Sequence, residues 1–320
     1  MSSSDADRTV SVIIPARDAA GSIAPLITAV RRQPPAGWNV EVVVVDDGSS
    51  DGTADAARAA GATVVELGAR SGGGNPAAAR NRGAMAAHGD PLVFLDADCL
   101  PGDEWLARLL AGHDAGAAVV GGALDLPAGL PPMARCDYYC GWYHVHSRRP
   151  AGAVPNHPPG NLSVRRGELA QTRGFTEAQP VAYAHEELGW QSEVRRRGGR
   201  IVFEPRAVAY HYNRPGFGNL LRRNYRWGFS AIESKAGTGA ARLAWVYDHP
   251  ILLVAAALPL ALATTGYIAW CWVRAGVLEP LLMLPVVLAA RIAYSAGLVA
   301  GGLRWIRYGT AAAEQRPRWE

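Results

Sequence analysis

The sequence predicts an α/β protein built on a doubly wound, mostly parallel sheet and followed by a pair of apolar helices. Two observations lead to this fold class. Short apolar runs of strand length alternate with helix-length amphipathic segments over residues 10–122, which is typical of βαβ units. Near the C-terminus, residues 251–273 and 281–303 are apolar over lengths near the roughly 20 residues that a helix needs to span a bilayer.

The expected strands are apolar runs that are too short and too sharply bounded to be helices. They are residues 10–15, 40–45, 63–67, 92–95 and 117–122. The second run is almost continuous Val, which suits a parallel strand covered on both faces. Three helices are expected between the strands. Ser22 can cap the first, the second runs through Ala60, and the third begins at Pro76.

Residues 124–211 are less regular and mix aromatic side chains with Pro-rich loops. Two short strands are expected there, at residues 201–203 and 208–210. Between the aromatic region and these strands, Glu186 and Glu187 open an amphipathic helix.

Residues 217–232 predict a helix with one apolar face and a basic remainder. The apolar face comprises Phe217, Leu221, Tyr225, Phe229 and Ile232. Arginine side chains at three nearby positions point largely elsewhere, and a helix of this composition lies in a membrane interface. An ordinary surface helix packed on the preceding domain is the alternative.

The flanks of the two apolar runs indicate their orientation. Arg242 precedes the pair, and Arg304 and Arg307 follow it; positive flanks mark the cytosolic side of a membrane. Residues 1–9 lack the basic start and apolar core of a signal peptide. We therefore expect a multi-pass protein of the cytoplasmic (inner or plasma) membrane with its first domain in the cytosol, and a buried helical hairpin of a soluble protein is the alternative.

Six segments follow from these features. They are a polar tail (1–9), the first half (10–123) and second half (124–213) of the α/β domain, an interfacial helix with its linker (214–248), two transmembrane helices (249–305) and a cytosolic tail (306–320). The net charge of +4 comes mostly from clustered Arg, which fits phosphate ligands or an anionic membrane surface better than nucleic acid. Four Cys in a chain of this length form no plausible disulfide framework and indicate a reducing compartment.

Acidic side chains follow two of the expected strands. Asp96 and Asp98 come after residues 92–95, and Asp46 and Asp47 end the second strand. The carboxyl ends of parallel strands form the ligand-binding edge of such a sheet, and oxygen ligands suit a hard divalent cation. Turn formation and helix capping are the alternative reading of both acidic pairs.

Several motifs occur in a fixed order across residues 10–211. They are SVIIPAR (11–17), VDDGSSDGT (45–53), ARNRG (79–83), FLDAD (94–98), GNLSVRR (160–166), the pair Glu186-Glu187, RGGRIVFEP (197–205) and Tyr210-His211. Together they resemble the family 2 glycosyltransferases, whose GT-A fold is a nucleotide-diphospho-sugar transferase fold with a mixed, mostly parallel sheet.

The resemblance implies a nucleotide-sugar donor, UDP-linked, with Mn²⁺ or Mg²⁺ on its diphosphate. The donor-contacting residues would be Pro15, Ala16, Arg17, Asp47, Arg80 and Asp96. Among them Asp47 would hold the base and Arg80 would approach the phosphates. Asp98 would hold the metal, with Asp96 assisting at the ribose or through water. His211 is a further metal candidate, and a structural His at a strand end is the alternative.

The resemblance also implies inversion at the anomeric carbon. Glu187 aligns with the usual catalytic Asp of the family and would deprotonate the acceptor hydroxyl, with Glu186 as the second candidate. Asn161 and Trp190 would contact the acceptor or the sugar. The sequence departs from the family pattern at Glu187, which is one methylene longer than Asp, and at Arg17, where Tyr is frequent.

Two further patterns have structural alternatives. Cys136, Cys140 and His144 follow one another at helical spacing and could face one metal ion, but packing of a helix on a sheet produces the same spacing and is favoured. Arg291 lies inside the second apolar run, where it would pair with a carboxylate or a lipid phosphate, or would mark a helix that sits off-centre.

The resulting hypothesis is a membrane-anchored inverting glycosyltransferase that acts on a membrane-proximal acceptor, lipid-linked or part of a cell-envelope glycan. Its partners would be a nucleotide sugar, the acceptor and membrane lipids, with no nucleic acid. Transfer to a soluble small molecule or peptide is the alternative among enzymes. An inactive membrane protein that binds sugar nucleotides is the alternative from another class.

Overall fold

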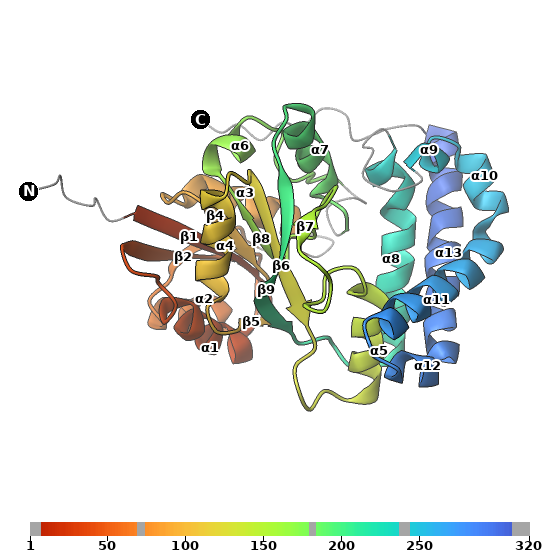
Figure 1. Ribbon diagram of the computed structural model, residues 1–320, viewed down its shortest axis with the longest axis horizontal. Helices are drawn as coiled ribbons and strands as arrows, with labels where there is room; N and C mark the ends of the chain where they lie inside the picture. The colour runs from red at the N-terminus through yellow and green to blue at the C-terminus, as the bar shows by residue number, and fades with distance from the viewer. Residues whose placement is uncertain (1–7, 69–73, 179–183, 237–243, 309–320) are drawn as a thin grey trace, which may run out of the picture.

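The computed structural model describes residues 8–68, 74–178, 184–236 and 244–308. One nine-stranded sheet forms its centre, in the order β3-β2-β1-β4-β8-β6-β9-β5, with β7 paired to β9 (Figure 1). The strands are β1 (Arg8–Ala16), β2 (Trp38–Asp46), β3 (Thr63–Glu66), β4 (Leu92–Leu95), β5 (Cys99–Pro101), β6 (Val119–Asp125), β7 (Gly152–Ala153), β8 (Asn161–Val164) and β9 (Ile201–His211).

Helices cover both faces of the sheet. They are α1 (Ala20–Arg31), α2 (Thr53–Ala59), α3 (Pro76–Ala86), α4 (Trp105–Asp114), α5 (Pro132–Gly141), α6 (Arg166–Ala170), α7 (Leu188–Arg196), α8 (Phe217–Lys235), α9 (Ala244–Tyr247), α10 (Pro250–Ala255), α11 (Ala257–Arg274), α12 (Glu279–Leu282) and α13 (Leu284–Tyr308). One apolar core joins α1, α2 and α4 to the sheet, and a second joins α3 and α7 to its other face.

The predicted mostly parallel sheet is confirmed. Strands β1, β2, β3 and β4 are mutually parallel neighbours, and β6 is parallel to β9. Strand β8 is antiparallel to both of its neighbours, as is β5 to β9. The two halves expected on either side of residue 123 share this one sheet, because β6 lies between β8 and β9.

Two local expectations differ from the structure. Helix α1 begins at Ala20 and not at Ser22, because the loop after β2 supplies acceptors for the backbone N–H groups of Ala19 and Ala20. The two short strands expected after Gly199 form one strand, β9, whose register against β6 shifts around Pro205, where the ladder loses a donor. Strand β5 and helix α4 were not expected. The Gly-rich loop at 70–73 and most of both tails lie outside the described residues.

The first C-terminal apolar run does not form a single helix. It is divided at Ala256 into α10 and α11. Residues 284–307 of α13, in the second run, form the one helix of the described residues that is long and apolar enough to cross a membrane. The expected pair of transmembrane helices is therefore reduced to one candidate, and multi-pass topology has no support from the structure.

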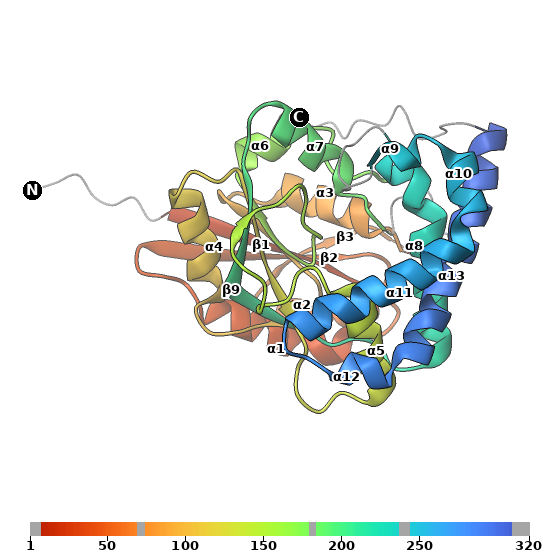
Figure 2. The same cartoon turned by 45° about the vertical axis from the view of Figure 1, so that its right-hand side comes forward.

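Helices α8 and α13 pack with their backbones in contact. A Cβ atom added at Gly228 would lie 1.9 Å from the Tyr294 carbonyl oxygen, and one at Gly297 would lie 2.0 Å from the Tyr225 carbonyl oxygen. Small residues permit such close approach between helices. Both views show the two helices side by side, at the edge of the molecule away from β1 and β2 (Figures 1 and 2).

Packing against α13 buries a face of α8 that coincides only in part with the predicted apolar face. The buried residues of α8 include Leu220, Asn224 and Gly228. From the predicted apolar face, Ile232 is buried as well, whereas Phe217 and Tyr225 are exposed. Helix α8 is thus packed along one face against α13 and leaves aromatic side chains on the surface.

Candidate active site

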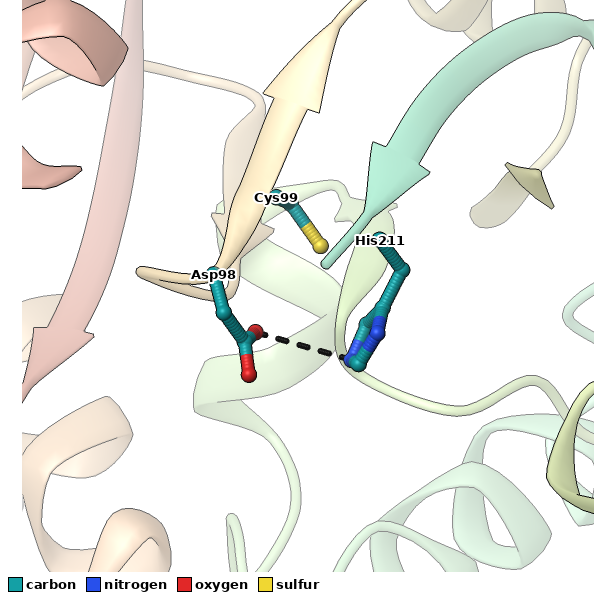
Figure 3. Close-up of side chains that lie close together, drawn as sticks. All are labelled: Asp98, Cys99 and His211. Carbon is teal, nitrogen blue, oxygen red and sulfur yellow. Dashed lines mark ion pairs between the residues drawn. The ribbon is translucent and has the colours of Figure 1, made fainter. Parts of the chain in front are cut away.

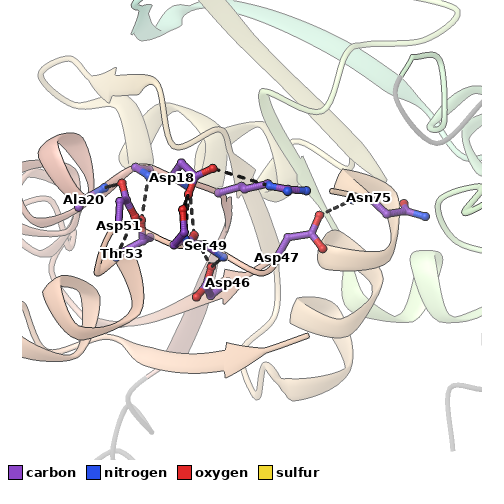
Figure 4. Close-up of polar contacts among 11 residues, drawn as sticks. Asp18, Ala20, Asp46, Asp47, Ser49, Asp51, Thr53 and Asn75 are labelled. Carbon is purple, nitrogen blue, oxygen red and sulfur yellow. Dashed lines mark hydrogen bonds and ion pairs between the residues drawn. The ribbon is translucent and has the colours of Figure 1, made fainter. Parts of the chain in front are cut away.

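The loops after β1 and β2 are joined by a network of short polar side chains. The Asp46 carboxylate accepts hydrogen bonds from the Ser49 backbone N–H at 3.0 Å and from the Ser49 hydroxyl at 2.5 Å. Ser49 in turn accepts from the Asp18 backbone N–H at 3.0 Å, and Thr53 accepts from the Ala19 N–H at 2.8 Å. These residues form turns, as the alternative reading of the motif expected, and they hold two loops at the carboxyl edge of the sheet (Figure 4).

Asp47 lies apart from that network. Its carboxylate is 5% exposed and accepts from the Asn75 backbone N–H, as Figure 4 shows. A Cβ atom added at Gly74 would lie 2.5 Å from the Asp47 carboxylate and 3.1 Å from the Arg17 side chain. The Asp47 N–H also bonds to the Ala16 carbonyl oxygen at 2.9 Å. The structure therefore brings Ala16, Arg17 and Asp47 together, with Pro15 adjacent in β1.

Arg80, on α3, lies between two acidic residues that are far apart in the sequence. Its Nη2 is 2.6 Å from Asp96 Oδ1 and its Nη1 is 2.5 Å from Glu186 Oε1. Arg80 and Glu186 are both buried. The negative charges of the two carboxylates outweigh the effect of burial and raise the pKa of the guanidinium. Arg80 is thus ion-paired with one member of each acidic pair.

The other member of the first pair, Asp98, faces β9. Its Oδ1 lies 3.5 Å from His211 Nε2, because β5 pairs Cys99 with His211 across the sheet. The ligand atoms of Asp98, Cys99 and His211 all lie within 4.8 Å of one another (Figure 3). Burial, followed by the charges of the neighbouring aspartates, raises the pKa of the Cys99 thiol well above its ordinary value. Asp98 and His211 offer an oxygen and a nitrogen ligand at this point, next to the buried Cys99 thiol.

The other member of the second pair, Glu187, occupies the N-cap position of α7. It is 5% exposed. Burial, and next the charge of Glu186, raise its pKa to about 8. Burial also raises the pKa of Glu186, but its ion pair with Arg80 opposes that effect. Glu187 is thus the acid of this pair that is suited to accept a proton near neutral pH.

Two predicted site residues lie inside the protein. The Asn161 side chain donates to the carbonyl oxygens of Ala123 and Ala207, at 2.7 and 2.9 Å, and accepts from Trp105 Nε1 at 2.7 Å. Trp190 is fully buried, with its ring centroid 5.5 Å from that of Phe175. Both side chains stabilise the core, and their contact with the acceptor or the sugar stays a prediction.

Some residues near the site were not found from the sequence. Lys235, at the end of α8, lies close enough to Glu187 for its charge to lower the pKa of that acid, and its Nζ is 3.4 Å from the Tyr294 hydroxyl. His185 Nδ1 lies 3.4 Å from the Ser230 hydroxyl. No local sequence signal marks these residues, because α8 approaches the site through tertiary packing.

The Cys136 and Cys140 spacing and the position of Arg291 are both explained by packing. Helix α5 ends at Gly141, and Cys136 and Cys140 pack in an apolar cluster with Trp272. Arg291 is buried, with its Nη1 3.4 Å from the Asn224 side-chain oxygen and its guanidinium 4.1 Å from the centre of the Tyr294 ring.

The chain is similar to known proteins over most of its length. The family described as "Glycosyl transferase family 2" matches residues 11–130. A glycosyltransferase of Haloferax volcanii, AglE, is 30% identical over 232 residues, which cover 70% of this chain and 73% of that protein. The pre-mycofactocin glycosyltransferase of Mycobacterium tuberculosis is 27% identical over 75% of this chain, which spans about half (52%) of its length.

Solved structures support the fold. The mannosyltransferase PcManGT from Pyrobaculum calidifontis, in complex with GDP-Man and Mn²⁺, superposes with a TM-score of 0.59 at 22% identity, covering 93% of this chain and 86% of its own. A mycobacterial protein superposes with a TM-score of 0.51 at 21% identity, covering 74% and 77%.

Proposed function

The chain belongs to glycosyl transferase family 2, and on that premise we propose that it is a metal-dependent, inverting glycosyltransferase acting on a membrane-proximal hydroxyl acceptor. One observation carries the proposal. Arg80 is ion-paired with both Asp96 and Glu186, which leaves Asp98 beside His211 and Glu187 with a raised pKa. One acid is thereby available for a cation and the other for a proton.

The donor would bind along the edge formed by β1, β2 and β4. Asp47 and Arg17 would contact the nucleoside, which we propose to be uridine. Asp98 and His211 would hold Mn²⁺ or Mg²⁺, and their carboxylate oxygen and imidazole nitrogen suit such ions. When bound, the metal neutralises charge on the departing diphosphate. Arg80 is ion-paired with Asp96 at 2.6 Å, and Asp96 would assist at the ribose or through water.

Glu187 would act as the general base. It would accept the proton of the acceptor hydroxyl while the oxygen bonds to the anomeric carbon and the nucleoside diphosphate leaves from the opposite face. This displacement inverts the configuration at that carbon. The raised pKa of Glu187 matches the proton affinity that a base needs near neutral pH.

The C-terminal helices favour an acceptor at a membrane. Large apolar side chains are exposed along them, including Ile251, Leu258, Leu262, Trp270 and Leu282. Exposed apolar surface of this extent marks an interaction site, and lipid is the partner that suits it. Lys235 lies where this helical layer meets Glu187, so a headgroup or lipid-linked phosphate reaching the base from that side would meet a cation.

The enzyme proposal can be tested with the purified full chain in detergent. A panel of UDP-sugars and GDP-mannose would be screened for a thermal shift with Mn²⁺, and then for metal-dependent transfer or donor hydrolysis. We expect one donor to shift the melting temperature and to be consumed. Donor binding without consumption, even with membrane extract supplied as acceptor, would favour the inactive binding protein. Product that stays in the aqueous phase would favour a soluble acceptor.

The membrane proposal can be tested separately by flotation with anionic lipid vesicles. Leu262 is exposed on α11, so Leu262→Glu should weaken vesicle binding without unfolding the chain. Thr28→Glu, on the exposed face of α1, is the control with the same added charge. Equal flotation of the two variants and the wild type in high salt would contradict lipid contact at this surface.

A further inference from the structure

His211 is held by a chain of side chains that leads away from the sheet. Its Nδ1 lies 2.9 Å from Asn213 Oδ1, and Asn213 Nδ2 donates to Asp137 Oδ2 at 2.7 Å. All three residues are buried. Asp137 is on α5 and is ion-paired with Arg223, on α8, at 2.5 Å. The chain therefore runs from the end of β9 through α5 to α8.

The order of donors and acceptors along this chain determines where the imidazole proton lies. The Asp137 carboxylate, ion-paired with Arg223, offers only acceptors. The amide nitrogen of Asn213 must therefore face Asp137, and the amide oxygen must face His211. That oxygen accepts, so His211 Nδ1 carries the hydrogen. In the neutral ring, Nε2 then keeps a lone pair on the side of Asp98.

Aromatic packing holds the same ring in place. The ring centroid of Trp142 lies 5.0 Å from that of His211 and 6.3 Å from that of Trp227. Arg223 lies over Trp227, 4.5 Å from the ring centre, and its Nη2 also donates to the Asp137 backbone oxygen at 2.7 Å. Arg223 thus ends the hydrogen-bond chain and supports the aromatic packing as well.

We propose that Asn213, Asp137 and Arg223 form a positioning relay that presents His211 Nε2 to a divalent cation at Asp98. The inference rests on the proposed metal site and adds three residues that act through His211 without touching the cation. Outer partners of this kind fix the orientation and tautomer of a ligating imidazole. Because Arg223 is on α8, and α8 is packed against α13, the helical layer helps to orient a ligand on the sheet.

The tautomer of His211 provides the first test, in metal-free protein. Long-range ¹H–¹⁵N spectra distinguish a protonated Nδ1 from a protonated Nε2, and the spectrum of His211→Asn identifies the His211 signals. We expect the Nδ1–H tautomer in the wild type. Asn213→Leu removes the acceptor, so His211 should shift toward Nε2–H, which can donate to Asp98. An Nε2–H tautomer in the wild type would overturn the proposal.

Cation affinity provides the second test, with Mn²⁺ as the probe and electron paramagnetic resonance as the readout, with and without UDP. We expect Asn213→Leu to weaken Mn²⁺ binding by about 10- to 100-fold, and Arg223→Met to weaken it less. Arg222→Met, at an exposed neighbouring position of α8, is the matched control and should leave affinity unchanged. Arg223→Met also serves if Asn213→Leu does not fold.

The outcomes separate the relay from the function on which it rests. Wild-type affinity and an unchanged tautomer in both relay variants would overturn the relay while leaving the metal site intact. If the wild type and Asp98→Asn bind Mn²⁺ equally weakly, the proposed metal site fails, and the relay's role toward a cation fails with it. Weaker Mn²⁺ binding in the relay variants, together with the shifted tautomer, would support the relay.

Discussion

Two acidic residues lie at the end of β4 and two lie at the start of α7, and the surroundings of the two pairs differ. At both, one acid pairs with Arg80, Asp96 on one side and Glu186 on the other. The acid left over at β4, Asp98, has a side chain that is 40% exposed and faces His211. The acid left over at α7, Glu187, is buried and has a raised pKa.

This difference shows how environment assigns chemistry to identical functional groups. A carboxylate that stays partly hydrated beside an imidazole can share a cation. A carboxylate that is desolvated beside a second acid binds a proton more tightly and becomes a base near neutral pH. Arg80 is ion-paired with one acid in each region. The second acid of each pair is left without that ion pair, so the two remaining acids can take different roles.

The largest effect is expected when the proposed proton acceptor is removed. Glu187→Gln keeps the shape of the side chain but cannot accept a proton, so transfer should fall by about 10²–10⁴ while donor affinity changes little. The measurement is the transfer rate together with nucleotide-sugar binding. A Glu187→Gln variant that transfers sugar at the wild-type rate would move the base elsewhere.

A smaller effect is expected when the cation site is weakened. Asp98→Asn should reduce transfer on the order of 100-fold, since a metal stabilises developing charge by several kcal/mol. The fold should be retained, because the Asp98 side chain is partly exposed. Titration of the rate with Mn²⁺ checks this, with Asp103→Asn, an exposed acid nearby, as control. Identical metal dependence in the two variants would exclude Asp98 as a ligand.

Much of this comparison could be anticipated from the sequence, because short motifs lie at strand ends. The positions of Asp98 and Glu187 follow from a strand of four apolar residues and from a helix start. The pairing of Arg80 with Glu186 could not be anticipated, since the two are 106 residues apart and meet through packing of α3 against the loop before α7. The resemblance already placed His211 among the metal candidates, but its approach to Asp98 depends on the pairing of β5 with β9, which was not expected.

The C-terminal region was harder to predict for a related reason. Composition indicated two membrane helices, but composition carries no information on where a helix breaks. The division at Ala256 and the glycine contacts between α8 and α13 depend on tertiary packing. Apolar faces are needed both for lipid contact and for helix packing, so the pattern at residues 217–232 could not distinguish them.

The third prediction changes the neighbour of the base. Glu186→Gln removes a negative charge that raises the pKa of Glu187, so the pH at which transfer reaches half its maximum should fall. The rate above that pH should fall less than in Glu187→Gln. In this variant Arg80 keeps its ion pair with Asp96, so the loss in the free energy of unfolding should be about 1–3 kcal/mol. Glu193→Gln, on α7, loses a partly exposed ion pair with Arg173 and is the control. A dead Glu186→Gln beside an active Glu187→Gln would reverse the two roles.

The last prediction concerns stability and not activity. Because the pKa of Glu187 rises from an ordinary 4.5 to about 8 on folding, the folded state binds the proton more tightly than the unfolded state. The resulting stabilisation is fully present below pH 4.5 and is lost as the pH rises through about 8. In the metal-free wild type, this contribution to the free energy of unfolding should decline across that window by an amount on the order of a few kcal/mol.

Glu187→Gln isolates that contribution, because Gln does not titrate. Urea unfolding of both proteins at several pH values from 5 to 8, chosen to lie within the window, gives the difference in free energy directly. The wild type should lose stability relative to the variant as the pH rises, while its transfer rate increases over the same range as the base ionises. Parallel stability curves for the two proteins would mean that Glu187 titrates at its ordinary pKa. The proposed difference in role between Glu187 and Asp98 would then rest on their positions alone.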